Sequence, residues 1–223
     1  MSGPMSDLLS EGLAQLKIPF TEQQLDKVHV FLEELERWNR RYGFVARSDR
    51  SHRRIDRRQL IIRHVLDSLA AWSTIQAIGQ RKQVADVGSG AGFPGVPLAV
   101  FMPDSRFTLL EPSAKKSAFL RNAAILADLR NVEVLETRLE DVGRRFDLVV
   151  FRAFSPLSRA SLAALERILE PNGAIVAYKG KLARIEEELV GLDAKKRNIV
   201  AVPVPFLDEE RHLVIVPRNP SAS

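Results

Sequence analysis

The clearest chemical signal in the sequence is the glycine-rich segment Asp86-Val-Gly-Ser-Gly-Ala-Gly-Phe-Pro-Gly95. Gly88, Gly90 and Gly92 can adopt positive φ and let the backbone approach a ligand with no Cβ in the way. An apolar run precedes the segment and an expected helix follows it, so free N–H groups would face the bound molecule. The pattern predicts a loop of the nucleotide-binding type.

The residues in and around this loop exclude some classes of ligand. A triphosphate-binding loop needs a lysine after its glycines, and none follows here. The dinucleotide fingerprint fails when it is counted from Gly88, where Phe93 takes the third glycine position, but is met when counted from Gly90. Pro94 and Pro97 remove N–H donors that would hold a pyrophosphate. The carboxylate of Asp86 favours a cationic ligand such as S-adenosylmethionine.

Further candidate cofactor contacts follow two later strand candidates. Glu111 ends the run Phe107-Thr-Leu-Leu and could accept hydrogen bonds from both ribose hydroxyls. Leu139 and Glu140 follow the third strand candidate, where an adenine edge could be read. The alternative is structural, since acids are common where helices begin and Glu111 could support a helix that opens near Ser113.

Candidate catalytic residues follow the fourth and fifth strand candidates. Arg152 and Lys179 end these strands, and ligands of open α/β sheets bind at the carboxyl ends of the strands. We expect the two cations to hold a phosphate or a guanine edge between them. The alternative is that both side chains are only solvated surface residues with no ligand.

A second polar patch lies on the helix expected to begin near Arg57. Arg63, His64, Asp67 and Ser68 occupy successive turns, and the spacing predicts an i,i+4 ion pair between Arg63 and Asp67. The patch either faces the glycine loop and shapes a substrate pocket, with His64 and Asp67 as candidate catalytic residues, or is an ordinary helix salt bridge. The four histidines are scattered without metal-ligand spacing, so no metal site is expected.

The positive charge of the chain is concentrated in one segment. Residues 37–63 contain ten arginines and two acids, which gives +8 and leaves −3 for the remainder of a chain whose net charge is +5. Arginine favours bidentate contact with phosphate and stacking on bases, so RNA is the expected partner. The alternative is a solvated loop. The predicted RNA contacts are Arg47, Arg50, Arg53, Arg54, Arg57 and Arg58.

The order of predicted elements indicates an α/β protein with a helical N-terminal cap. A capping box formed by Thr21 and Gln24 opens a helix over residues 22–40, a loop follows over 42–54, and the next helix begins near Arg57. Strands are predicted at 83–87, 107–110, 132–135, 147–151, 174–178, 198–203 and 212–216. Helices are predicted between them at 96–101, 113–127, 157–169 and 182–195.

This alternation predicts a mostly parallel sheet. The last two strands are joined by too few residues for a crossover helix and should pair antiparallel. We expect a cap over residues 1–80 and a second domain over residues 81–218.

Composition excludes several classes of protein. The chain has no cysteine, which excludes disulfides, a thiolate nucleophile and cysteine-ligated metals. Its apolar runs fall short of the roughly 20 residues that span a bilayer, and its start lacks the features of a secretory signal. We expect a cytoplasmic monomer that needs neither a metal nor a membrane.

Together these motifs resemble the bacterial RsmG (GidB, glucose-inhibited division protein B) methyltransferases, which make 7-methylguanosine in 16S ribosomal RNA. The matching pieces are Trp38-Asn39, Arg63-His64-Val-Leu-Asp67-Ser68, Asp86 to Gly95, Arg152-Ala-Phe154, Lys179-Gly180 and Glu210-Arg211-His212-Leu213. The resemblance implies a Rossmann-like S-adenosylmethionine-dependent methyltransferase fold and a substrate of 16S ribosomal RNA or the assembling small subunit. It also implies cofactor binding by Gly88, Phe93, Leu139, Glu140 and Arg152.

Three segments depart from the family pattern. Gly43-Phe44-Val45 stands where the family has an Asn-Leu-Thr type segment, Glu111-Pro112 replaces an Asp-Ser type pair, and Phe151 replaces a serine. Glutamate keeps the ribose acceptor, so the expected cofactor is unchanged. The altered segment after Tyr42 bears on how RNA would dock.

Methylation of guanine N7 needs no general base, because this nitrogen has a free lone pair and no proton to lose. In that reaction Arg152 and Lys179 would hold the guanine O6 or a phosphate. Three other functions stay open from the residues alone: an NAD-linked oxidoreductase, a non-enzymatic RNA-binding assembly factor with a vestigial cofactor fold, and methylation of a small molecule.

Overall fold

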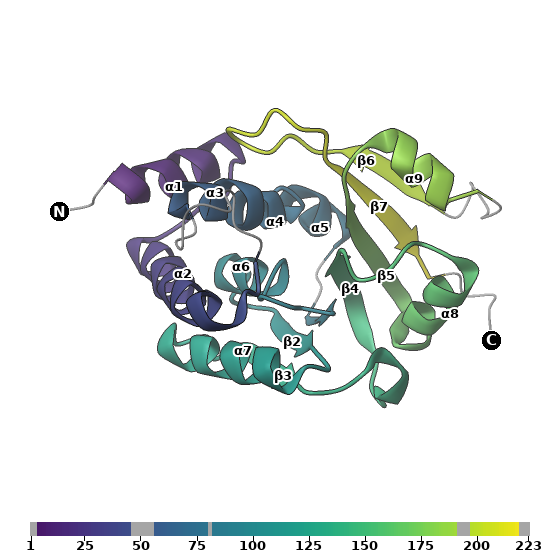
Figure 1. Cartoon of the computed structure of the whole chain (residues 1–223). Coiled ribbons are helices and arrows are strands. Elements are labelled where there is room, and N and C mark those ends of the chain that lie inside the picture. Colours follow the sequence, from purple (N-terminus) through teal and green to yellow (C-terminus); the bar gives the residue numbers. More distant parts are fainter. Residues whose placement is uncertain (1–3, 46–55, 80–81, 191–196, 219–223) are drawn as a thin grey trace.

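The computed structural model describes residues 4–45, 56–79, 82–190 and 197–218. Its centre is one seven-stranded sheet with the strand order β3-β2-β1-β4-β5-β7-β6 and helices on both faces (Figure 1). The strands are β1 (Gln83–Val87), β2 (Arg106–Leu110), β3 (Val132–Leu135), β4 (Phe146–Arg152), β5 (Leu169–Lys179), β6 (Asn198–Ala201) and β7 (His212–Pro217).

The first five strands are parallel, and β7 runs antiparallel between β5 and β6. The predicted mostly parallel sheet and its antiparallel final hairpin are therefore confirmed. In β1 and β2 every residue after the first is buried, as expected for parallel strands covered on both faces.

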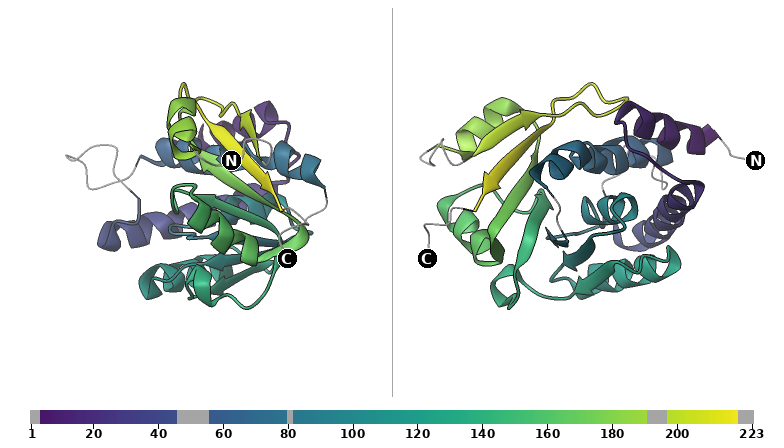
Figure 2. Two further views of the ribbon diagram at one scale, coloured as in Figure 1. Left: turned by 90° about the vertical axis from the view of Figure 1, so that its right-hand side faces the viewer. Right: turned by 180° about the vertical axis from the view of Figure 1, so that it is seen from behind.

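Helices divide between the two faces of the sheet, as the views in Figure 2 also show. One face carries α1 (Pro4–Gln15), α2 (Glu22–Tyr42), α3 (Arg57–Leu60), the π-helical segment η1 (Ile61–Leu66), α4 (Asp67–Leu69), α5 (Trp72–Ile78), α6 (Gly95–Phe101) and α7 (Ala114–Leu126). The other face carries α8 (Arg159–Arg167) and α9 (Leu182–Glu188), and the short 3₁₀ helix η2 (Leu139–Asp141) links β3 to β4.

The helices of the N-terminal cap share one hydrophobic core with the sheet. Leu32 of α2 and Leu66 of η1 belong to the same buried cluster as Val84 of β1 and Val150 of β4. A second cluster lies on the opposite face, between the sheet and α8 and α9. The cap thus completes one face of the sheet.

The predicted start of α2 is confirmed in detail. The Thr21 side chain accepts a hydrogen bond from the Gln24 N–H at 3.3 Å, and the Gln24 side chain accepts one from the Thr21 N–H at 2.9 Å. The helix ends two residues later than predicted, at Tyr42, and is followed by Gly43, whose φ of +64° caps it.

The helix predicted from Arg57 is not one regular α-helix. It begins at Arg57 but widens into a π-helical turn over Ile61–Leu66 before α4 and α5 follow. This widening changes which side chains share a face, because π turns bond i to i+5. On the other side of the sheet, α9 ends at Glu188 rather than 195, although 191–196 lie outside the described residues.

Replacing Thr21 by alanine is expected to lower the free energy of unfolding by about 1 kcal/mol, because the first turn of α2 loses its side-chain acceptor. Thr21→Ser keeps that acceptor and should keep most of the stability. Urea unfolding of the two variants measures the difference. Equal stability of Thr21→Ala and the unchanged protein would show that the capping box contributes nothing.

Candidate cofactor and substrate site

Backbone hydrogen bonds hold the glycine loop against the end of β2. The N–H groups of Gly88 and Ser89 both donate to the carbonyl of Leu110, at 2.9 and 3.1 Å. Gly88, Gly90 and Gly92 have φ values of +69°, +58° and +90°, which favour glycine at each position. The loop therefore has a definite shape that the protein itself maintains.

Glu111 is buried beside this loop. Its Oε2 accepts a hydrogen bond from the Gly90 N–H at 2.8 Å, and its Oε1 accepts one from the Ser113 N–H at 2.9 Å. The bond to Ser113 supports the helix that opens at this residue, which is the structural role predicted as an alternative for Glu111. The bond from Gly90 places the carboxylate directly against the glycine loop, where each oxygen keeps a further lone pair for a ligand hydroxyl.

Asp86 lies beneath the loop, where it is completely buried. Its Oδ2 accepts from the Gly95 N–H at 2.9 Å, and a Cβ at Gly95 would lie 2.6 Å from the same oxygen. Burial raises the pKa of Asp86 to about 7, although the hydrogen bond from Gly95 opposes the shift. Among the described residues no group pairs with Oδ1.

Asp67 joins two arginines from distant parts of the chain. Arg152 donates to its Oδ2 and the Arg211 Nε donates to its Oδ1, each at 2.8 Å. The predicted i,i+4 pair between Arg63 and Asp67 is wrong. The widened η1 precedes Asp67, and Arg63 instead donates to Gln59 at 2.7 Å and pairs with Glu209 at 2.7 Å.

Arg152 also contacts His64 and the glycine loop. Its Nη2 lies 2.9 Å from His64 Nδ1, which must be the acceptor because a guanidinium has only donors. Burial, followed by the charges of Arg152 and Arg63, lowers the pKa of His64 to about 3, so the ring is neutral. The Phe93 ring lies 5.0 Å from the His64 ring and 5.3 Å from the Arg152 guanidinium carbon. The polar patch therefore lies against the loop through Phe93.

Lys179 does not lie beside Arg152, because its side chain is on the other face of the sheet. Arg152 pairs in register with Tyr178, whose hydroxyl donates to the Ser68 carbonyl on the cap side of the sheet. The next residue must point to the other face, where Lys179 forms an ion pair with Glu188 at 2.5 Å. The expectation that Arg152 and Lys179 hold one group between them is therefore wrong.

Leu139 and Glu140 lie on η2. Leu139 is buried in the cluster that contains Val87 and Leu110, the last residues of β1 and β2. Glu140 is exposed, and Arg167 of α8 donates to its carbonyl at 2.7 Å and to that of Leu139 at 3.3 Å. The structure thus holds this turn by its backbone, and its contact with adenine stays a prediction.

Of the six predicted RNA contacts, Arg47, Arg50, Arg53 and Arg54 lie outside the described residues. Arg58 is exposed. Arg57 is half-buried, with its guanidinium 3.4 Å from a carboxylate oxygen of Glu36 and 3.8 Å from one of Glu33. An RNA phosphate would have to compete with these carboxylates for Arg57.

Two residues of this site carried no assigned role in the sequence. Arg211 shares Asp67 with Arg152, and the available signals were its position directly before the last strand and its place in the matching piece Glu210-Arg211-His212-Leu213. Phe154 follows Ala153, whose φ is +54°, and its ring fills the place where a Cβ at Gly88 would lie, 2.6 Å from its Cδ2. Its place in the Arg152-Ala-Phe154 motif was the available signal.

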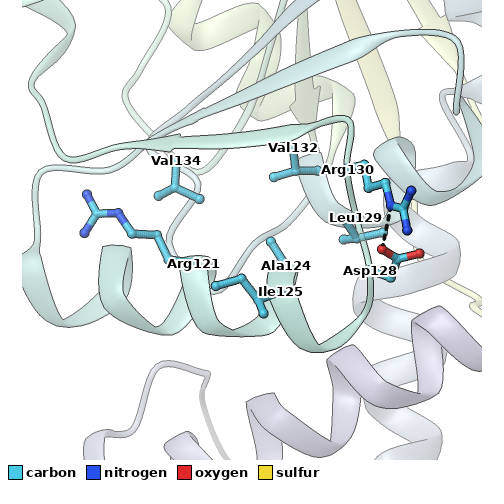
Figure 3. Close-up of a pocket in the computed structure, with 8 residues that line it drawn as sticks. All are labelled: Arg121, Ala124, Ile125, Asp128, Leu129, Arg130, Val132 and Val134. Carbon is cyan, nitrogen blue, oxygen red and sulfur yellow. Dashed lines mark hydrogen bonds and ion pairs between the residues drawn. The ribbon is translucent and has the colours of Figure 1, made fainter.

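A hollow in the surface lies elsewhere, between α7 and β3 (Figure 3). This groove of about 430 Å³ is lined mainly by apolar side chains, with the Asp128–Arg130 ion pair at one end. None of its lining residues is a predicted cofactor-binding or catalytic residue. Within the described ranges, no three acidic or histidine side chains are grouped as metal ligands, and no helix is long and apolar enough to cross a bilayer.

Comparison with known proteins gives consistent matches. The GidB family model, described as rRNA small subunit methyltransferase G, matches residues 24–214. The ribosomal RNA small subunit methyltransferase G of Laribacter hongkongensis is 39% identical over 216 residues, covering 94% of this chain and 97% of that protein. The protein of the same name from Nitrosococcus oceani is 32% identical over 210 residues, covering 93% and 92%.

Solved structures agree on the fold. The precorrin-6y C5,15-methyltransferase of Geobacter metallireducens superposes with a TM-score of 0.51 at 17% identity, covering 68% of this chain and 88% of that one. The predicted Rossmann-like methyltransferase fold is confirmed.

Replacing Asp67 by asparagine is expected to lower the free energy of unfolding by about 3 kcal/mol, because two partly buried guanidinium groups lose their shared carboxylate. Glu209→Gln is the matched control. It removes a more exposed carboxylate that also bridges two arginines, and should cost less than about 1 kcal/mol. Urea unfolding measures both. Similar small losses would show that Asp67 does not anchor the cap.

The buried carboxyl of Asp86 should make stability depend on pH. Its pKa of about 7 in the folded protein lies above the ordinary 3.8, so its stabilising contribution is full below about pH 4 and is lost as pH rises through 7. Asp86→Asn removes this loss. The unfolding free energy of the variant relative to the unchanged protein should therefore rise by about 1.4 kcal/mol per pH unit in that window. Urea unfolding at several pH values tests this, and a constant difference would contradict it.

Proposed function

Because this chain belongs to the rRNA small subunit methyltransferase G family, we propose that it transfers a methyl group from S-adenosylmethionine to N7 of a guanine in 16S ribosomal RNA. The Rossmann-like methyltransferase fold agrees with this membership, and so do relatives that match over nearly their whole length. The oxidoreductase and the non-enzymatic assembly factor are not favoured by it.

The observation that carries the cofactor assignment is the contact between the glycine loop and Glu111. A carboxylate bonded to the Gly90 N–H lies at the end of β2, and ribose hydroxyls could reach its remaining lone pairs. The buried Oδ1 of Asp86 has no partner among the described residues, and burial raises the pKa of this carboxyl. The Glu111 carboxylate at the glycine loop fits a cofactor that carries a ribose, and the buried carboxyl of Asp86 fits a group that supports the loop from below.

The cofactor would be held by residues of three segments. Gly88, Gly90, Gly92 and Phe93 would contact it through the loop, Glu111 would bind the ribose, Leu139 and Glu140 would border the adenine, and Asp86 would support the loop from below. When bound, S-adenosylmethionine supplies an electrophilic methyl group. The protein must then place the guanine nitrogen in line with that methyl group and exclude water.

His64 does not need to act as a base in this reaction. Its Nδ1 is occupied by Arg152, and its pKa is lowered to about 3 by burial and by neighbouring arginines. A neutral, weakly basic imidazole suits a transfer in which guanine N7 already has a free lone pair. We assign His64 and Asp67 positioning roles.

Arg152 is a positioning residue in this proposal. Its Nη atoms bond to Asp67 and His64, and its guanidinium lies over the Phe93 ring. These contacts hold the glycine loop and the cap in one arrangement. Lys179, which is paired with Glu188 on the other face of the sheet, has no role in the proposed site.

The RNA substrate would be drawn by the arginine-rich segment. Arg58 is exposed, and Arg47, Arg50, Arg53 and Arg54 are proposed as further phosphate contacts. We further propose that the protein acts as a monomer on the RNA of an assembling small subunit.

The test is methyl transfer from labelled S-adenosylmethionine to small ribosomal subunits purified from cells that lack this protein. Nucleoside analysis of the RNA should place the label in 7-methylguanosine. Glu111→Ala should raise the dissociation constant for S-adenosylmethionine by roughly 10- to 100-fold, because the ribose loses a charged acceptor. Glu136→Gln, which alters an exposed pair with Arg121, is the control and should behave like the unchanged protein.

Two results would contradict the proposal. Label in a nucleoside other than 7-methylguanosine would place the methyl group elsewhere. Failure of the unchanged protein to bind S-adenosylmethionine would remove the cofactor assignment and favour a non-enzymatic role on the ribosome.

A further inference from the structure

Four aromatic side chains form a cluster at the C-terminal end of α2, namely Trp38, Tyr42, Phe44 and Phe119. The Tyr42 and Phe44 rings are nearly parallel, with an interplanar angle of 13° and centroids 5.7 Å apart. Trp38 lies behind both, at 5.5 Å from Tyr42 and 6.3 Å from Phe44. We propose that Tyr42 is a stacking surface for an unpaired base of the RNA substrate.

The cluster leads from the core to the surface. Phe119 of α7 is fully buried and contacts both Trp38 and Phe44, which are half-buried. Tyr42 is the outermost ring, with 38% of its surface exposed. An exposed ring supported from behind by other rings loses little freedom when a flat ligand stacks on it, which favours binding.

Positive charge surrounds the exposed ring. The Arg41 guanidinium carbon lies 5.4 Å and the Lys115 Nζ lies 5.6 Å from the Tyr42 ring centroid. Arg40 is exposed in the same last turn of α2. In the described part of the chain, no carboxylate forms an ion pair with any of these three cations, so they can contact phosphates on either side of a stacked base.

The position of Tyr42 relates it to the proposed cofactor site. The start of α2 lies beside the ends of α6 and α7, because Gln24 donates to the Val100 carbonyl and Lys27 to the Asp128 carbonyl. The end of α2 therefore lies beside the start of α7, which follows Glu111 by three residues. Tyr42 is thus on the same edge of the sheet as the glycine loop.

A continuous series of ring contacts joins the two places. Phe93 of the loop packs on Phe31 at 5.4 Å, Phe31 on Phe119 at 6.2 Å, and Phe119 on the cluster around Tyr42. RNA stacked on Tyr42 would therefore contact a cluster that packs, through Phe31, against the proposed cofactor loop. This inference rests on the proposed RNA substrate and places a base contact near the start of the arginine-rich segment, residues 37–63.

An unpaired RNA strand explains these features better than a protein partner. Aromatic rings flanked by arginine and lysine are the usual surface for single-stranded nucleic acid, since each base offers a flat face and each phosphate a negative charge. A duplex keeps its bases stacked inside and cannot use the ring of Tyr42. The expected ligand is therefore a loop or a single-stranded stretch next to the modified guanine.

The test compares the binding of a fluorescent single-stranded RNA homopolymer and of an RNA duplex of equal length. Tyr42→Ala should weaken single-strand binding by roughly 5- to 150-fold, the range for loss of one base–aromatic stack, and change duplex binding little. Tyr42→Phe keeps the ring and should bind normally. Phe20→Ala removes a ring of similar exposure at the other end of α2 and is the matched control.

Arg41→Gln and Lys115→Gln test the charges around the ring. Each should make the salt dependence of single-strand binding shallower, because one phosphate contact is lost. Arg130→Gln, at the far end of α7, is the control and should leave that dependence unchanged. In methyl transfer, Tyr42→Ala should raise KM for RNA while kcat and the affinity for S-adenosylmethionine stay the same.

Three outcomes would overturn the inference. The first is normal single-strand binding by Tyr42→Ala. The second is equal weakening of single-strand and duplex binding, which would indicate charge without stacking. The third is a loss of binding to whole subunits but not to naked RNA, which would indicate a ribosomal protein partner.

These results are separable from those on the proposed function. Selective loss of single-strand binding in Tyr42→Ala supports the inference even where the unchanged protein transfers no methyl group. Methyl transfer by the unchanged protein, together with normal RNA binding and KM in Tyr42→Ala, removes the inference alone.

Discussion

The carboxylate of Asp67, shared between Arg152 and Arg211, is the interaction on which the arrangement of the site depends. Its partners lie 85 and 144 residues away in the chain, at the end of β4 and just before β7. A buried carboxylate without partners would be very unfavourable, so folding must bring these three segments together. Once Arg152 is fixed by Asp67, it orients His64 and covers Phe93.

The residues that fix the shape of the glycine loop lie on its inner side. Its glycines give the backbone freedom, but contacts from β2, Glu111 and Asp86 remove that freedom again. A loop held in this way does not pay the entropy of ordering when a ligand arrives. Its three anchors are two carboxylates and a strand carbonyl, which leaves the outer surface of the loop for binding.

Much of the fold was predictable from local patterns, and the exceptions have physical causes. Strands buried on both faces appear as short apolar runs, and the capping box at Thr21 marks the start of α2. The π-helical turn before Asp67 could not be read from local spacing, because pairing with Arg152 and Arg211 involves residues far along the chain. The position of Lys179 does not follow from its place at a strand end, because the register of β4 and β5 sets the face that each side chain occupies.

The shared core of the cap and the sheet restricts how this protein can change. Side chains of α2 and η1 fill the same cluster as those of β1 and β4, so neither part has a complete interior without the other. A cap from a distant relative could not be grafted onto this sheet without rebuilding the apolar surface on both sides of the join. Substitutions in the buried faces of the helices that carry the basic residues must therefore be matched by substitutions in the sheet. The cap and the sheet have to evolve as one unit.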